Sequence, residues 1–307
     1  MSEKIDFDLL VNRALQNEEL SAMRPVVEKE LLHYDVLFCL DKAGLLDGLV
    51  FQGGTSLRLC YNSNRFSEDL DFAGGRTFCS VQLLAVKSCI EEYIGARYGF
   101  AISVKAPGEL RQLPDYDQIN VDRWQITIET SPRQSNIARQ RIKIEIANVE
   151  AYTRNTRALG RNYFVLPDGY SDTLIYVETL EEVMADKLVA FPATQTYIRY
   201  RDMWDLVWLY QQGARINMPL LISKLADYRI ENYAEKVREK RDALKGIMQK
   251  GVFHNEMRRF IPTDVYERTL ATEKFNGYFL TTLRDVLNDV LSGMEDKTED
   301  QSSEFLM

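Results

Sequence analysis

The chain has 307 residues, with 38 lysines and arginines against 46 aspartates and glutamates, so its formal charge is −8. Its 45% hydrophobic and 27% charged residues are ordinary globular values, which exclude wholesale disorder. No apolar run is long enough to span a membrane, and the N-terminus lacks a basic segment followed by an apolar one, so we expect a cytoplasmic protein without membrane association. Four cysteines without CxxC spacing and two histidines make a zinc site improbable.

The first part of the chain mixes helical and strand patterns. Helical apolar spacing over 25–44 predicts a helix, and the apolar run 48–51 predicts a strand that ends at a pair of glycines. A second strand is expected over 70–72, followed by an amphipathic helix over 81–95. Three more predicted strands, of which the last two alternate apolar and polar residues, are 100–104, 124–129 and 141–146.

The second part of the chain, from Leu180 onward, is helical nearly to its end. The predicted helices are 180–191, 201–212, 218–228, 232–250 and 276–293. This order predicts an α+β protein with a mixed sheet in the first part and a helical bundle in the second. We place the αβ domain with its N-terminal helices at 1–200, the bundle at 201–294 and a disordered tail at 295–307.

The glycine pair has the features of a phosphate-binding turn. Gly53 and Gly54 stand between a predicted strand and a predicted helix, where backbone can come close to an anion. The first turn of a helix presents unpaired N–H groups and the positive end of its dipole. The hydroxyls of Thr55 and Ser56 are additional donors at this place.

Acidic residues follow on the next predicted strands. Asp69 and Asp71 are two residues apart, so both carboxylates project from one face of a strand, an arrangement that suits Mg²⁺. Glu145 lies on the polar face of the strand 141–146 and can complete a three-carboxylate site if the two strands are neighbours. Glu129, in a similar alternating strand, is the competing third carboxylate.

These residues resemble a known family. Gly53-Gly54-Thr55 with residues 65–72, Arg-Phe-Ser-Glu-Asp-Leu-Asp-Phe, resembles motif I of the AbiEii/AbiGii-type nucleotidyltransferase toxins, a branch of the DNA polymerase β-like superfamily. Residues 181–190 resemble that family's lysine-bearing helix, and 199–206 resemble its arginine–aspartate helix. The resemblance runs from about residue 30 to residue 212 and implies a polymerase β-like core.

The resemblance implies a Mg²⁺-dependent transferase, with Mn²⁺ as the alternative ion, that uses a nucleoside triphosphate. Its metal would be held by Asp69, Asp71 and Glu145. Its triphosphate would be bound by Gly53, Gly54, Thr55, Ser56, Arg65, Ser67 and Lys187. Lys187 would neutralise phosphate charge, and an aspartate of the second helix, Asp202 or Asp205, would be needed for activity, unless these residues form a structural salt-bridge ladder. Some relatives are silenced by phosphorylation at the serine that matches Ser67.

By resemblance, the setting is a bacterial toxin–antitoxin pair in abortive infection, with the 3′ end of tRNA as acceptor and a cognate antitoxin as partner. The window 236–259 carries a net charge of +5, from eight basic and three acidic residues, and offers an RNA-binding surface unless its charges pair along a helix. Tyr197, Tyr200 and Trp204 are candidates for base stacking. The residues proposed to contact RNA are Arg199, Arg201, Lys236, Arg238, Arg241 and Lys245.

Two other functions stay open from the sequence. The acceptor could be a protein or small-molecule hydroxyl, in which case the basic window has no role. The chain could also be a nucleotide- or partner-binding module without activity, although simple binding does not require adjacent carboxylates. We expect a monomer.

Overall fold

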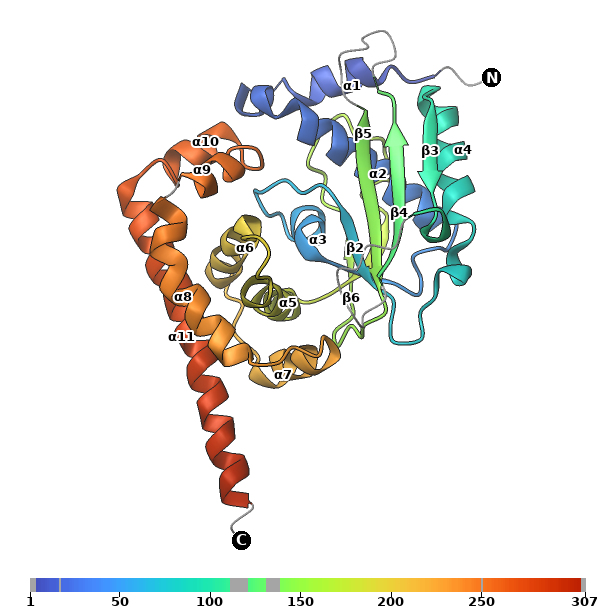
Figure 1. Ribbon diagram of the computed structural model, residues 1–307. Helices are drawn as coiled ribbons and strands as arrows, with labels where there is room; N and C mark the ends of the chain where they lie inside the picture. The colour runs from blue at the N-terminus through green and yellow to red at the C-terminus, as the bar shows by residue number, and fades with distance from the viewer. Residues whose placement is uncertain (1–3, 17, 111–120, 131–138, 250, 305–307) are drawn as a thin grey trace. The chain divides into compact units, whose positions relative to one another are not determined.

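A computed structural model describes residues 4–16, 18–110, 121–130, 139–249 and 251–304. The chain divides into two compact units, Met1–Glu178 and Thr179–Met307 (Figure 1). This division precedes the predicted one after residue 200, because helix α5 (Leu180–Ala193) packs against other helices of the second unit. The buried Lys224 Nζ lies 2.7 Å from Glu182 Oε1 of α5, which fixes α5 in that unit.

The first unit contains a seven-stranded mixed sheet in the order β3-β4-β5-β2-β1-β7-β6. The pairs β2–β5 and β1–β7 are parallel, and the other neighbouring pairs are antiparallel. The sequence did not predict β6 and β7, because both are short and every residue of β6 is exposed. The strands are β1 (Val50–Gln52), β2 (Leu70–Ala73), β3 (Ile102–Lys105), β4 (Val121–Ile128), β5 (Gln140–Ala147), β6 (Asn155–Ala158) and β7 (Leu174–Val177).

The helices of this unit pack against the sheet and against one another. Helix α2 contacts α4 and β5, α3 contacts β1 and β2, and α4 contacts β3. The helices are α1 (Phe7–Ala14), α2 (Arg24–Lys42), α3 (Gly53–Cys60) and α4 (Val86–Tyr98), with 3-10 turns η1 (Glu18–Met23), η2 (Ser80–Leu83) and η3 (Pro107–Glu109). Of these, α1 and the 3-10 turns were not predicted.

The alternation in β4 and β5 separates an apolar from a polar face of the sheet. Ile142, Ile144 and Ile146 are buried, whereas Lys143 and Glu145 between them are half-buried. On β4 the side chains of Trp124, Ile126 and Ile128 are likewise buried. Because successive residues of a strand point to opposite faces, the intervening charged residues gather on the second face.

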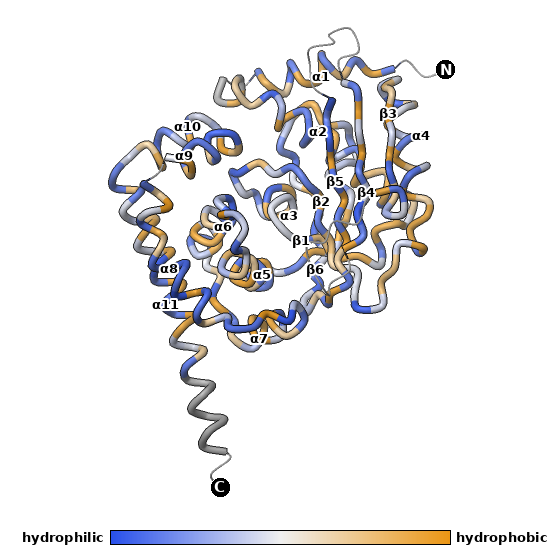
Figure 2. Tube along the Cα trace, in the orientation of Figure 1, coloured by the Kyte–Doolittle hydropathy of each residue, from blue (hydrophilic) through white to orange (hydrophobic). Residues whose placement is uncertain are grey.

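The second unit is helical, as the sequence predicts. Helix α8 lies along α11, and α6 packs against α5, α9 and α11 (Figure 1). Figure 2 shows α8 as largely hydrophilic, whereas α7 carries a hydrophobic stretch. Among the described residues, no helix is both long and apolar enough to cross a bilayer. The helices after α5 are α6 (Tyr200–Gln211), α7 (Met218–Asp227), α8 (Tyr233–Gln249), α9 (Val252–Met257), α10 (Thr263–Arg268) and α11 (Glu273–Glu304).

Helix α11 extends beyond its predicted end at residue 293. It continues to Glu304 and so includes most of the segment predicted as a disordered tail, while 305–307 lie outside the described residues. Residues 295–304 are polar and contain no glycine or proline, so helical backbone can continue there without an apolar face.

Candidate active site

The glycine pair allows other side chains to approach the start of α3 closely. Gly53 has a φ of +76°, and a Cβ atom at this position would lie 2.8 Å from Asp71 Oδ2. A Cβ on Gly54 would lie 2.2 Å from Arg65 Nη2 and 2.9 Å from Ser67 Oγ. The absence of side chains on the two glycines therefore brings a carboxylate, a guanidinium and a hydroxyl together at one helix N-terminus.

The two hydroxyls after the glycines bond to backbone. Thr55 Oγ1 donates to the carbonyl of Asp69, and Ser56 Oγ donates to the carbonyl of Gly53 at 2.9 Å. Both side chains are buried. The two hydroxyls therefore stabilise the turn and hold the backbone of Asp69. Either hydroxyl would have to give up its bond to the backbone before it could donate to a phosphate.

The strands that carry Asp71 and Glu145 are neighbours, which is the condition set above for Glu145 to stand beside the aspartates. Strands β2 and β5 are parallel neighbours, and Asp71 is directly opposite Glu145. Asp69 lies just before β2, and its backbone carbonyl accepts a hydrogen bond from Thr55 Oγ1. Glu129 follows the far end of β4, where it forms an ion pair with Arg139. Along β4, Glu129 lies about 20 Å from Arg123, the residue that pairs with Glu145.

The chemistry of these donors suits a hard divalent cation. Two carboxylates placed directly opposite each other on neighbouring strands repel, and a cation between them removes that repulsion. Within the described part of the chain, no three Asp, Glu, His or Cys side chains are gathered into a ready-made metal cage. Magnesium does not require such a cage, because it commonly binds one or two carboxylates together with substrate phosphates and water. Asp69 and Asp71 are carboxylates of the kind that Mg²⁺ binds, and Glu145 is a third carboxylate opposite Asp71.

Helix α2 supports the loop that leads into β2. Lys29 Nζ lies 2.9 Å from Glu68 Oε1, and His33 Nε2 lies 3.1 Å from the Glu68 carbonyl oxygen. Burial lowers the pKa of His33 to about 4. The ring is therefore neutral at pH 7, with Nε2 as the protonated nitrogen that donates to the carbonyl. These two contacts fix the residue that precedes Asp69.

A buried ion pair supports the same loop from α3. Arg58 Nε and Nη2 lie 2.9 and 3.1 Å from the two carboxylate oxygens of Glu30, whose side chain is 1% exposed. Arg58 also donates from Nη1 to the Ser63 carbonyl at 3.0 Å and lies over the ring of Phe66. No local pattern predicts this pair, because its members are 28 residues apart.

The lysine and aspartates of the second unit form one cluster. Lys187 Nζ on α5 lies 2.6 Å from Asp202 Oδ1 and 3.1 Å from Asp205 Oδ2 on α6. Arg199 also pairs with Asp202. Burial alone would raise the pKa of Asp202, but the charges of Lys187 and Arg199 outweigh it and hold this pKa below its usual range. The cluster joins α5 to α6 and keeps the Asp202 carboxylate ionised.

Several of the basic residues proposed to contact RNA are paired within the second unit. Arg238 Nη2 lies 3.0 Å from Glu295 Oε1, and Arg241 contacts Asp242 and, at 3.2 Å, Asn288. Arg201 lies over the ring of Phe260, while Lys236 is half-buried and Lys245 is exposed. Lys240, which contributes to the charge of the window, is buried and donates to the Thr194 carbonyl, and Lys250 lies outside the described residues. The window therefore presents less positive charge than its composition indicates.

The three aromatic candidates differ in their surroundings. Tyr197 is 57% exposed, and its hydroxyl accepts a hydrogen bond from Arg199. Trp204 is buried against Phe279, and Tyr200 is half-buried with its ring 6.3 Å from that of Phe253. Tyr197 is thus the one of the three whose ring is accessible for stacking.

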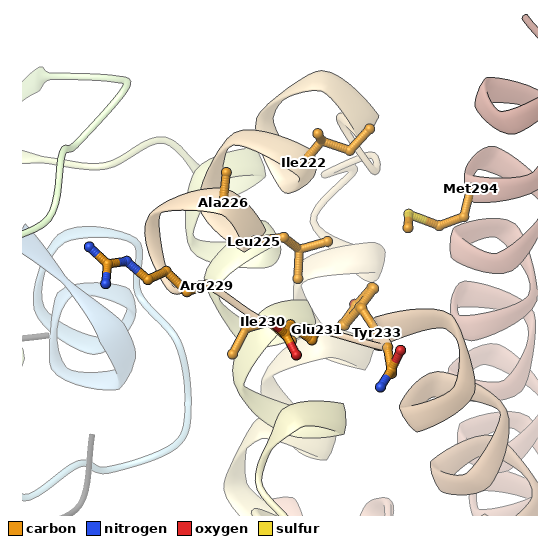
Figure 3. Close-up of a pocket in the computed structure, with 9 residues that line it drawn as sticks. Ile222, Leu225, Ala226, Arg229, Ile230, Glu231, Tyr233 and Met294 are labelled. Atoms are coloured by element: carbon orange, nitrogen blue, oxygen red, sulfur yellow. The ribbon is translucent and has the colours of Figure 1, made fainter. Parts of the chain in front are cut away.

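A cavity of about 430 Å³ opens in the second unit between α7, the segment after it and α11. Figure 3 shows Ile222 and Leu225 pointing toward Met294 across it. None of the predicted site residues lines this cavity, so it is separate from the residues described above. Its lining is Ile222, Leu225, Ala226, Arg229, Ile230, Glu231, Asn232, Tyr233 and Met294.

The sequence prediction missed two residues beside the carboxylates. Gln52 of β1 is directly opposite Asp71, and Arg123 of β4 is directly opposite Glu145. Arg123 Nε lies 2.6 Å from Glu145 Oε1. Arg123 is next to Trp124, which points to the apolar face, so the alternation of the strand places Arg123 on the polar face of the sheet. Only the strand order shows that Arg123 is opposite Glu145.

Comparisons with known proteins show what the chain is similar to. Two structures from Helicobacter pylori are similar to this chain: JHP933 has 16% identity and a TM-score of 0.43, with 91% of this chain and 97% of that chain covered. The protein described as a "putative nucleotidyltransferase" has 18% identity and a TM-score of 0.44, with 87% and 97% covered. No curated protein matches the sequence. Residues 35–286 match the family described as "Nucleotidyl transferase AbiEii toxin, Type IV TA system", and the chain therefore belongs to this family of nucleotidyltransferase toxins.

Proposed function

We propose that this nucleotidyltransferase toxin transfers a nucleoside monophosphate from a nucleoside triphosphate to the 3′ end of tRNA, and that it does so in defence against phage. The observation that supports the transfer chemistry most strongly is the register of Asp71 and Glu145 on parallel strands beside the N-terminus of α3. Membership of the family implies a cognate antitoxin. Translation would stop because a tRNA with an extended 3′ end cannot be aminoacylated.

The residues of the first unit have distinct tasks in this proposal. Asp69, Asp71 and Glu145 would hold Mg²⁺, and the ion would supply positive charge to the triphosphate and lower the pKa of the attacking hydroxyl. Gly53 and Gly54 let the backbone N–H groups at the start of α3 approach the phosphates. The acceptor hydroxyl forms a bond to the α-phosphorus while the bond from that phosphorus to pyrophosphate breaks, and no covalent enzyme intermediate is needed.

The buried guanidinium of Arg65 supplies fixed charge beside the glycines. It is 2% exposed and donates from Nη1 to the Phe66 carbonyl at 2.7 Å, while Nη2 lies against Gly54. A cation held in this way needs little reorganisation when negative charge develops on the phosphates, which favours the transition state over the ground state. Ser67 is also buried at the same glycine, so a phosphate attached to its hydroxyl would block the turn.

A label-transfer assay tests this proposal. Purified chain and Mg²⁺ are mixed with total bacterial RNA and each of the four α-labelled triphosphates in turn, with Asp71→Asn as the inactive variant. Asp122→Asn is the matched control, because Asp122 is opposite Ile146 and so belongs to the other face of the sheet. We expect label on tRNA-sized RNA with wild type and Asp122→Asn and at least a thousandfold less with Asp71→Asn. Label on a protein would replace the tRNA acceptor by a protein hydroxyl, and equal labelling by Asp71→Asn would refute the assigned site.

A further inference from the structure

Four polar side chains form a row across the middle of the sheet. Gln52, Asp71, Glu145 and Arg123 are directly opposite one another on β1, β2, β5 and β4. Directly opposite residues on neighbouring strands point to the same face, so the row lies on the face that carries the carboxylates. All four side chains are half-buried, and Gln52 Oε1 is buried and accepts no hydrogen bond from the described residues.

Arg123 stands at the end of this row with its guanidinium held in place. Its Nε lies 2.6 Å from Glu145 Oε1, and the two side chains are 31% and 25% exposed. Among the described residues, Arg123 donates this one hydrogen bond, and it does so through Nε. The two terminal nitrogens, Nη1 and Nη2, therefore keep donors for a ligand in the fork geometry that matches a phosphate.

A second cation lies on the same face. Lys143 precedes Glu145 by two residues on β5 and is opposite Gln125, so its side chain shares a face with Glu145 and Arg123. On two neighbouring strands, Arg123 and Lys143 occupy a diagonal pair of positions about 7–8 Å apart. An Arg–Glu pair across two strands is by itself an ordinary sheet contact, but here two cations border two opposed carboxylates beside a glycine turn.

We propose that Arg123 is a substrate-binding residue: positioned by Glu145, it binds a phosphate group of the substrate at the carboxylate face, with Lys143 as a second positive charge. The inference rests on the proposed transfer reaction, which brings both a triphosphate and an RNA strand to this face. Either substrate supplies the phosphate, and the two sources are distinguished by experiment.

The test uses Arg123→Gln and Arg123→Lys in the full chain. The matched control is Arg139→Gln, which removes an equal charge from an exposed ion pair with Glu129 away from the carboxylates. Binding of a non-hydrolysable triphosphate and of tRNA is measured separately by fluorescence anisotropy, and KM is measured for each substrate. Thermal unfolding of each variant shows that the fold is kept.

We expect Arg123→Gln to weaken binding of one substrate about ten- to a hundredfold relative to Arg139→Gln, because a bidentate charge-assisted contact is lost. Arg123→Lys should recover part of this loss, since lysine keeps the charge but not the fork. If the phosphate belongs to RNA, the slope of log affinity against log salt concentration falls by about 1. If it belongs to the triphosphate, affinity and KM for the triphosphate change and the RNA salt slope does not.

Failure of this inference differs from failure of the proposed function. A wild-type chain that transfers label while Arg123→Gln binds both substrates as Arg139→Gln does would overturn the role of Arg123 alone. A lower unfolding temperature for Arg123→Gln with unchanged affinities would also overturn it, because the residue would then only stabilise the sheet. A wild-type chain that binds neither substrate and transfers no label would overturn the proposed function, and this inference with it.

Discussion

Replacing Gly54 by alanine tests the close packing at the start of α3. The added methyl group would lie 2.2 Å from Arg65 Nη2 and 2.9 Å from Ser67 Oγ, and an ordinary contact needs at least 3.4 Å. Arg65 is 2% exposed and donates to the Phe66 carbonyl at 2.7 Å, so its guanidinium cannot move without disturbing a buried charge-assisted hydrogen bond. Such a bond contributes roughly 1.5–3 kcal/mol to the free energy of unfolding. Alanine has a higher helix propensity than glycine, which offsets up to about 1 kcal/mol of that loss.

We therefore expect Gly54→Ala to lower the free energy of unfolding by about 0.5–2 kcal/mol. Displacing Arg65 and Ser67 by about an ångström should also lower kcat/KM for the triphosphate by roughly ten- to a hundredfold. Urea unfolding and label-transfer kinetics measure the two effects. The control is Gly48→Ala, because a Cβ on Gly48 would meet no atom within 4 Å. If Gly54→Ala equals Gly48→Ala in both measurements, the argument from the glycine turn is wrong.

Two further predictions concern buried charges of the first unit. Arg58→Met leaves the Glu30 carboxylate buried and without its ion pair, so we expect the free energy of unfolding in urea to fall by about 3–5 kcal/mol. The double variant Arg58→Met/Glu30→Gln should recover most of this loss. Equal losses in the single and double variants would contradict the ion-pair argument. Burial raises the pKa of Asp35 from 3.8 to about 6 despite hydrogen bonds from two tyrosines and an ion pair with Arg97, so the folded state binds the proton more tightly than the unfolded state. The stability from Asp35 is therefore full below about pH 4 and is lost as the pH rises through 6, by about 3 kcal/mol; Asp35→Asn should remove this loss, and urea unfolding of both proteins between pH 4 and pH 7 measures it.

The sequence predicted those parts of the site that depend on local pattern. The alternation in 141–146 predicted which face Glu145 occupies, because the side-chain period of a strand leaves no choice once Ile142, Ile144 and Ile146 are buried. The glycine pair after an apolar run likewise predicted where α3 begins. Both features are set within a few residues of the chain.

The parts that failed or were missed depend on contacts far along the chain. The pairing of Arg123 with Glu145 requires the order of β4, β5 and β2 in the sheet, which no local period encodes. The assignment of α5 to the second unit depends on its packing against α6 and α7, whereas its sequence shows only that it is helical. Strand β6 was missed because none of its residues is buried, so it has no apolar alternation to detect.

The Lys187 cluster bears on the two roles predicted for that lysine, which are neutralising phosphate charge and forming part of a structural salt-bridge ladder. Lys187 is held between Asp202 and Asp205, and Arg199 also pairs with Asp202, so two cations and two carboxylates nearly neutralise one another in a buried setting. A lysine in such a cluster adds little positive potential at a distance, and its first effect is to fix α5 against α6. Asp202 bridges both cations, so its removal disturbs more of the cluster than removal of Asp205. Because the cluster joins α5 to α6, replacing any one of these residues is expected to lower the stability of the second unit together with transfer.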